Sequence, residues 1–118
     1  MPVKHIDSIP LEKMDTGKKV NRQVLISTQE APHFAMRRFV IEAGGEMPRH
    51  TNTVEHEQYI LHGRAVIGIG EETHHVQKND VIFIPANVPH WYKVEGGENF
   101  EFLCLVPNQQ DKMEMVKS

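Results

Sequence analysis

Apolar residues in this chain come in short runs between turn-forming residues, and no run carries a helical stripe over several turns. The run from Phe34 to Ile41, F-A-M-R-R-F-V-I, is typical of a strand, and the Ala43-Gly44-Gly45 segment after it predicts a turn. Glycine, proline and asparagine separate the other runs. Strands are expected over residues 24–26, 34–41, 47–52, 56–61, 65–69, 74–77, 81–84, 90–94 and 100–106. This pattern predicts an all-β sandwich or barrel.

The 118 residues suit one domain with one core. Residues 23–107 hold the expected strands and form the predicted barrel. Residues 1–22 are expected to form an irregular arm, and residues 108–118 a loose tail or a terminal turn that docks on a partner. The apolar residues of the arm are Val3, Ile6 and Ile9. Because they could add a swapped strand to the sheet of a second copy, a homodimer is expected.

Composition and charge narrow the classes of partner. The net charge is −3 with histidine neutral, so no basic surface for nucleic acid is expected. No apolar segment is long enough to span a membrane, and the first residues are charged where a secretion signal would be apolar. The single cysteine, Cys104, excludes an intrachain disulfide. A cytoplasmic protein without membrane partners is therefore expected.

The residues that carry chemistry gather in two turn-rich stretches. The first, from Gly44 to Gly63, contains His50, Asn52 and His56, and the second ends in P-A-N-V-P-H at His90. Imidazoles brought together from separate strands are typical ligands of Mn²⁺, Fe²⁺, Ni²⁺, Cu²⁺ or Zn²⁺, whereas Mg²⁺ and Ca²⁺ prefer carboxylate oxygen. One divalent transition metal per chain is expected, and the residues do not select its identity.

The spacing of the first stretch resembles the first motif of the cupins. That motif is a glycine, five residues, His, one residue, His, three or four residues, Glu, six residues and a second glycine. Here the motif positions are Gly44, His50, Asn52, His56 and Gly63. The spacing is kept, while asparagine replaces the second histidine and histidine replaces the glutamate.

The second stretch resembles the second cupin motif, which is Gly, five residues, Pro, one residue, Gly, two residues, His, three residues and Asn. Its positions here are Asn79, Pro85, Asn87, His90 and Val94. Both glycines are replaced by asparagine, the residue other than glycine that best tolerates a positive φ. Val94 departs from the family asparagine without an evident physical reason.

The resemblance covers residues from about 34 to 106 and implies a double-stranded β-helix, or jelly-roll, barrel. It extends to small single-domain cupins of the conserved-barrel type whose metal ligands are all histidine. In that subgroup His50, His56 and His90 would bind the metal, and Asn52 would occupy the place of the missing histidine. Asn52 could ligate through its carbonyl oxygen or could hydrogen-bond a water on the metal.

Four further residues are candidates for the pocket. Arg37 turned inward would anchor a substrate carboxylate, and turned outward it would be a solvated charge. Phe102 and Cys104 share one face of the last strand, which the resemblance places inside the barrel. Cys104 is then either a soft, oxidisable group near the metal or a small buried hydrophobe. Gln58 lies two residues from His56 on the same side and is expected to line the pocket.

Three functions are compatible with this site. Cupins of this kind imply a metal-dependent oxidoreductase, with dioxygenase chemistry on a small organic substrate as the leading hypothesis. Because a set of neutral imidazoles leaves the metal its full charge, that substrate could be an anion. No general base is evident. The alternatives are a non-catalytic small-ligand or sugar-binding or sensor module, and a metal-dependent isomerase or decarboxylase.

Overall fold

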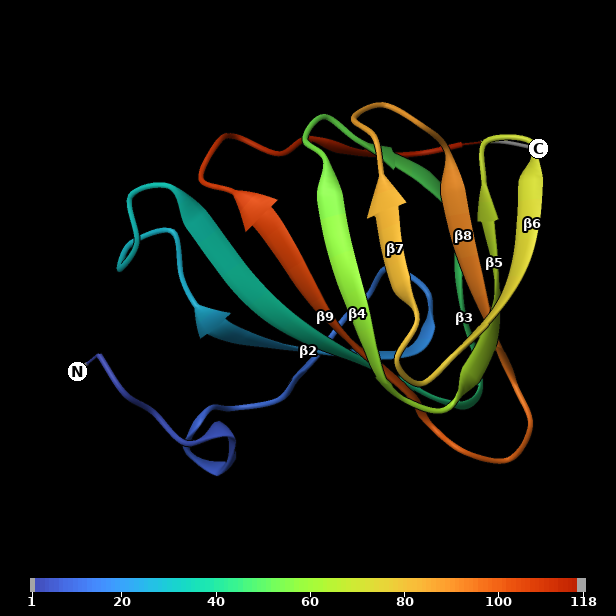
Figure 1. The fold of residues 1–118 in the computed structure, drawn as a ribbon, viewed down its shortest axis with the longest axis horizontal. Helices are drawn as coiled ribbons and strands as arrows, with labels where there is room; N and C mark the ends of the chain where they lie inside the picture. The colour runs from blue at the N-terminus through green and yellow to red at the C-terminus, as the bar shows by residue number, and fades with distance from the viewer. Residues whose placement is uncertain (1, 117–118) are drawn as a thin grey trace.

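One antiparallel sheet curls into a barrel, and side chains along its strands alternate between the buried interior and the solvent (Figure 1). The last long strand shows the pattern, because Phe102 and Cys104 face the interior and are 1% and 0% exposed, whereas Leu105 between turns outward and is 40% exposed. Alternation of this kind lets one face fill the core while the other meets solvent. The predicted all-β jelly-roll fold is confirmed.

The computed structural model describes residues 2–116. A single turn of 3₁₀ helix precedes ten strands. The elements are η1 (Ile6–Ser8), β1 (Glu12–Lys13), β2 (Lys18–Ile26), β3 (Phe34–Asn52), β4 (His56–His62), β5 (Arg64–Ile69), β6 (Glu72–Gln77), β7 (Val81–Ile84), β8 (His90–Glu95), β9 (Phe100–Pro107) and β10 (Met113–Met115). Over this part of the chain, none of the helical structure has the length or apolarity that crossing a bilayer requires.

The strands follow the order β6-β5-β8-β3-β9-β4-β7, with β2 and β10 added along β3. Every pairing is antiparallel. Strands distant in sequence are therefore neighbours in space, as a jelly roll requires. This arrangement brings β3, β4 and β8, which carry the four candidate ligands, to one side of the interior.

Strand β3 is continuous where the sequence predicts a turn at residues 43–45. Its first half pairs with β9 and its second half with β8. Gly44 lies between the halves with φ of 82°, in the region that glycine reaches without strain. The prediction of a turn that ends the strand was therefore wrong: the glycine pair lets one long strand bend and serve both halves of the barrel.

The two asparagines of the second motif have the backbone geometry that the sequence predicts. Asn79 has φ of 76° and Asn87 has φ of 67°, both in the left-handed region. The amide of Asn87 also donates a hydrogen bond of 2.7 Å to the carbonyl of Asn52. This turn therefore ties the second motif to the end of β3.

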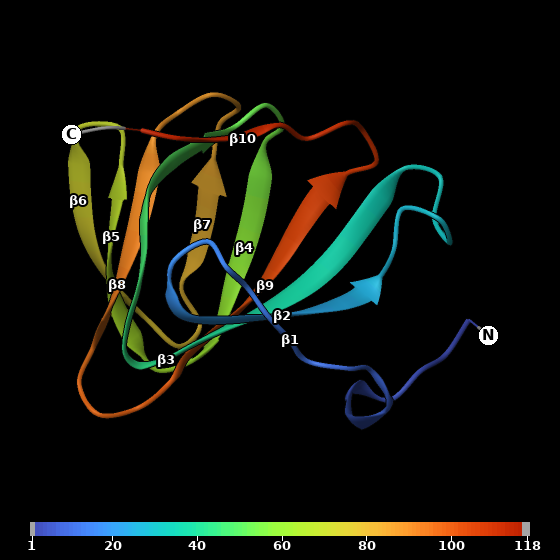
Figure 2. The ribbon, with the colours of Figure 1, turned by 180° about the vertical axis from the view of Figure 1, so that it is seen from behind.

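The C-terminal segment differs from the loose tail that the sequence predicts. Its strand β10 pairs with the end of β3, with Met113 opposite Asn52 and Met115 opposite His50 (Figure 2). The two methionines alternate along the segment, as strand residues do. The described part of the segment, residues 108–116, thus covers the part of β3 that carries two candidate ligands. Residues 117 and 118 lie outside the described residues.

The N-terminal arm is shorter than predicted, because β2 begins at Lys18. The side chain of Gln23 donates hydrogen bonds to the carbonyls of Ile6 (3.1 Å) and Ile9 (2.9 Å), which fastens the arm to the edge of its own sheet. Exchange of this arm between two copies, and the homodimer, stay predictions.

Stacked aromatic rings fill the middle of the barrel. The Phe102 ring stacks on Phe39 on one side and on Tyr92 on the other, each at 5.2 Å between centroids. On the outside of the same wall, Trp91 packs against Gly68, where an added Cβ would come within 1.9 Å of the indole nitrogen. Aromatic packing therefore holds β8 from both faces.

The positive φ of Asn87 predicts an ordered set of stabilities. Asn87→Gly should leave the free energy of unfolding within about 0.5 kcal/mol of wild type, whereas Asn87→Val should lower it by about 1–2 kcal/mol, because a β-branched residue is strained in the left-handed region. Urea denaturation measures the difference. Equal stability of the two variants would contradict the backbone geometry.

Candidate metal centre

A cavity of about 310 Å³ opens into the barrel beside the candidate ligands. His50 and Asn52 come from the end of β3, His56 from the start of β4 and His90 from the start of β8. Figures 1 and 2 show that the β3–β4 turn, the β7–β8 loop and the C-terminal segment meet at the same end of the barrel. All four predicted ligands line this one cavity.

His50 and His90 are held in the same manner. The Nδ1 of His50 bonds the carbonyl of Pro48 at 2.8 Å, and the Nδ1 of His90 bonds the carbonyl of Val88 at 2.9 Å. A carbonyl can only accept, so Nδ1 carries the proton and Nε2 keeps its lone pair. The two rings lie 4.2 Å apart between centroids. Both imidazoles are therefore fixed in the tautomer that a metal ligand needs.

Four polar atoms of the cavity wall lack a hydrogen-bond partner. Among residues 2–116, the buried side-chain nitrogen or oxygen atoms without a partner are Arg22 Nε, Arg37 Nε, Arg49 Nε, Asn52 Oδ1 and His56 Nε2. All but the Arg49 atom belong to residues that line the cavity. Because an unpaired buried polar group is costly, such a cluster marks a place that binds something.

Burial keeps the three imidazoles neutral. Loss of solvent lowers the pKa of His50, and it lowers the pKa of His90 to about 4, with the nearby His50 adding to the effect. The pKa of His56 falls to about 4 through burial and the positive charge of Arg37. Neutral imidazoles are the form that binds metal ions.

Arg37 points inward, which resolves the two alternatives for its side chain. Its Nη2 lies 3.4 Å from Cys104 Sγ, and its guanidinium carbon sits 5.2 Å from the centre of the Phe39 ring. Arg22 lines the same cavity and lies 3.7 Å from Glu12. Sequence reasoning missed Arg22, because nothing in its neighbours shows which face of β2 turns inward. The cavity thus holds two guanidinium groups.

Cys104, Gln58 and Phe102 all face the cavity, as predicted. Burial raises the pKa of the Cys104 thiol, and the thiol lies 3.6 Å from His56 Nδ1. Gln58 lies 2.8 Å from the Tyr92 hydroxyl through its amide nitrogen, and burial raises the pKa of Tyr92. Cys104 is therefore a protonated thiol that hydrogen-bonds its neighbours, and its catalytic role stays a prediction.

Asp111 is a site residue that the sequence did not identify. It belongs to the segment between β9 and β10, and its Oδ2 lies 3.1 Å from Asn52 Nδ2 and 3.5 Å from His56 Nε2. No motif contains it, and it lies well beyond the second motif. The alternation of Met113 and Met115 was the only sequence signal for a return of this segment to the sheet.

The donor set fits a transition metal, although its atoms are not drawn together into a closed site. No group of three or more His, Cys, Asp or Glu side chains between residues 2 and 116 already surrounds a common point as metal ligands would. The fit rests on donor chemistry: two fixed Nε2 lone pairs, the unpaired Nε2 of His56 and the unpaired carbonyl oxygen of Asn52.

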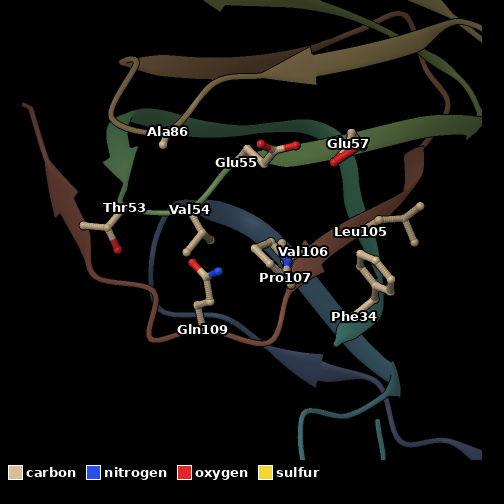
Figure 3. A pocket seen from close by; sticks show the side chains of 10 residues that line it. All are labelled: Phe34, Thr53, Val54, Glu55, Glu57, Ala86, Leu105, Val106, Pro107 and Gln109. Carbon is tan, nitrogen blue, oxygen red and sulfur yellow. The ribbon is translucent and has the colours of Figure 1, made fainter. Parts of the chain in front are cut away.

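A larger hollow, of about 640 Å³, lies on the outside of the barrel (Figure 3). Phe34, Glu57, Leu105 and Gln109 are among the residues that border it. Its described lining includes neither histidine nor cysteine. The smaller interior cavity is therefore the candidate site, because of the two it is the one lined by imidazole, thiol and guanidinium groups.

Comparison with known proteins decides the family. A family model of the cupin domain matches residues 37–106, more than half of the chain. The chain belongs to the cupin family. No curated protein sequence matches this cupin. The finer resemblance, to cupins whose ligands are all histidine, stays a prediction.

Solved structures superpose along most of this chain. The polyketide cyclase RemF from Streptomyces resistomycificus matches with a TM-score of 0.91 at 26% identity, over 100% of this chain and 87% of its own. A cupin-2 domain from Rhodospirillum rubrum matches at 0.85 and 25% identity, over 98% and 80%. A predicted oxalate decarboxylase from Thermotoga maritima, at 0.81 and 21% identity over 89% and 97%, supports the fold alone.

The lowered pKa values predict that metal-free protein loses stability in acid. Below pH 6.5 the unfolded chain protonates His56 and His90, whereas the folded chain resists until about 4. The unfolded state then holds more protons, so the free energy of unfolding should fall as the pH drops from 6.5 to 4, by about 3 kcal/mol for each imidazole. Urea denaturation across this range measures the slope.

Two variants control this experiment. His90→Gln should flatten the pH dependence, and His75→Gln should leave it unchanged, because the His75 side chain is 74% exposed. An equal slope in wild type and His90→Gln would show that the buried imidazole does not cause the loss of stability.

Proposed function

We propose that this cupin is a metal-dependent enzyme that acts on a small organic anion inside the barrel. The proposal rests on one observation, the set of four unpaired buried atoms around the cavity. Asn52 Oδ1 and His56 Nε2 offer lone pairs, which call for a cation. Arg22 Nε and Arg37 Nε offer N–H groups on cationic side chains, which call for an anion.

The imidazoles of His50, His56 and His90 would hold the metal. The carbonyls of Pro48 and Val88 fix the rings of His50 and His90, so that little rotamer freedom is lost when the ligands bind. An ion bound there would supply Lewis acidity and, where redox-active, one-electron chemistry with O₂.

The two arginines would anchor the substrate. Arg37 reaches Cys104, and Cys104 reaches His56, so the guanidinium lies two contacts away from a candidate ligand. A carboxylate held by Arg37 would therefore place the rest of a small molecule beside the histidines. The stacked rings of Phe39, Phe102 and Tyr92 give the cavity an apolar wall that excludes water from the reacting atoms.

Dioxygenase-like oxidation is the reaction we favour. The thiol of Cys104 and the hydroxyl of Tyr92 stay protonated because burial raises the pKa of each, so neither serves as a base near neutral pH. Chemistry centred on the metal needs no such base.

A redox-neutral reaction is the second candidate. It is favoured by the match to a polyketide cyclase along the full length of this chain at 26% identity. Cyclisation or decarboxylation of a small carbonyl compound would use the same anion anchor and the same metal ligands. The two reactions differ in one measurable respect, since only the oxidation consumes O₂.

Metal content tests the proposal directly. Untagged protein, reconstituted above pH 7 where imidazoles are deprotonated, should hold close to one transition metal ion per chain by mass spectrometry. His50→Ala should lose that ion, and Asn52→His should hold it more tightly. If the reconstituted protein held no stoichiometric metal, the metalloenzyme hypothesis would be contradicted. The alternative of a non-catalytic small-ligand or sensor module would then remain.

Arg37→Gln tests the anion anchor. The assays use metal-loaded protein and a panel of small carboxylic acids, with an oxygen electrode and with product analysis in the absence of oxygen. Arg37→Gln should raise KM by about 10–100-fold, because one charge-assisted contact with the substrate is lost. The metal content should be unchanged. Arg38→Gln is the matched control, because Arg38 points to the other face and pairs with Glu101 and Gln23. Equal effects on KM in the two variants would contradict the assignment.

A further inference from the structure

The segment that follows β9 returns across the end of the barrel (Figure 2) and brings the carboxylate of Asp111 within 3.5 Å of His56. It leaves the barrel at Pro107, passes Gln109 along the outer hollow and returns to β3 as β10. Asp111 lies on this return, and its side chain is 25% exposed. Neither cupin motif includes this part of the chain.

Backbone and side-chain contacts fix the position of Asp111. Its Oδ1 accepts a hydrogen bond of 3.1 Å from the amide of Thr53. The hydroxyl of Thr53 in turn accepts one of 2.8 Å from the amide of Lys112. Beyond these contacts, β10 pairs with His50, Thr51 and Asn52. The carboxylate is therefore oriented before any ion binds.

The other oxygen of Asp111 faces two buried groups that need a partner. Oδ2 lies 3.1 Å from Asn52 Nδ2 and 3.5 Å from His56 Nε2. His56 is 6% exposed, and its Nε2 has no hydrogen-bond partner among the described residues. In the tautomer that binds a metal, the His56 proton is on Nδ1, toward Cys104, and the Nε2 lone pair faces the carboxylate oxygen. A cation between the two atoms would make that arrangement favourable.

The spacing of these two atoms suits neighbouring ligands of one ion. Zinc lies about 2.0–2.2 Å from nitrogen and carboxylate oxygen, so adjacent ligands are about 3.0–3.5 Å apart. The 3.5 Å between Oδ2 and His56 Nε2 meets this range and exceeds an ordinary hydrogen bond. A direct ion pair between the two side chains would be expected to close further.

We infer that Asp111 is a ligand of the metal. It supplies, from the C-terminal segment, the fourth protein donor, which in a site of four histidines would come from a histidine at the position of Asn52. This inference rests on the proposed metal site. Asn52 then acts as a positioning residue, because its Nδ2 holds the Asp111 carboxylate. The site becomes three imidazoles and one carboxylate, and one negative charge offsets part of the charge of the ion.

Metal affinity, measured by competition with a chromogenic chelator for Zn²⁺ on untagged protein, tests the inference without an activity assay. Asp111→Asn should weaken Zn²⁺ binding by at least about 100-fold, since it removes an anionic ligand but keeps an acceptor for Thr53. Glu114→Gln is the matched control, because that carboxylate on the same segment is 65% exposed and should leave affinity unchanged. Asn52→His should restore affinity to Asp111→Asn.

A spectroscopic variant separates a ligand from a residue that only positions others. Asp111→Cys loaded with Co²⁺ should show a near-ultraviolet charge-transfer band from thiolate to cobalt, which Glu114→Cys should lack. The only native cysteine, Cys104, is present in both proteins and in the wild-type reference. The band requires a direct bond, so a structural effect of the substitution cannot produce it.

Two results would overturn the inference while the proposed function stands: less than a tenfold loss of Zn²⁺ affinity in Asp111→Asn, or no thiolate band in Asp111→Cys that binds Co²⁺. Failure of the wild-type protein to bind any of these ions would overturn the proposed function and this inference together. The two failures are therefore distinguishable.

Discussion

A polar atom in the dry interior of a barrel must find a partner, and the whole candidate site follows from this constraint. The jelly roll satisfies the backbone through its strand pairings, but it leaves Asn52 Oδ1 and His56 Nε2 unpaired beside two guanidinium nitrogens. One small cavity thus contains unpaired acceptors, which would bind a cation, and unpaired donors, which would bind an anion. A cation and an anion bound side by side would satisfy both, which is the arrangement of a metal with its substrate.

The fold could be predicted because the turn residues and the alternation along the strands both indicate the same β-barrel. Asn79 and Asn87 stand where tight turns need a positive φ, and the structure shows that φ at both. Alternation placed Phe102 and Cys104 on one face, the cupin resemblance implied that this face looks into the barrel, and both residues are buried there. The bend of β3 was mistaken for a turn between two strands, because a glycine at positive φ serves a turn and a bulge equally well.

The histidines could be found because motif spacing fixes their places on β3, β4 and β8. Asp111 and Arg22 could not, because each reaches the cavity through pairing between segments far apart in sequence. Met113 lies opposite Asn52, and Arg22 lies opposite Phe39. Such register is set by the folded sheet, and no pattern within a single segment encodes it.

A carboxylate from outside the motifs would also change how the site is assembled. Three histidines belong to the two motifs of the barrel, whereas Asp111 arrives with a short strand held by three residue pairs. Docking of that strand and binding of an ion would stabilise each other, because each completes the surroundings of the other. The C-terminal segment would then dock and the metal site would then fill in one coupled step.

The packing of Trp91 has an optical consequence. It is the only tryptophan of the chain, it follows His90 directly, and its indole rests on Gly68 in the barrel wall. The tryptophan emission of this protein therefore arises from one side chain on the far side of the wall that carries a candidate ligand. A paramagnetic ion in the cavity would quench that emission and a diamagnetic ion would not. Trp91 is therefore an intrinsic fluorescence probe of the kind of ion that the protein has bound.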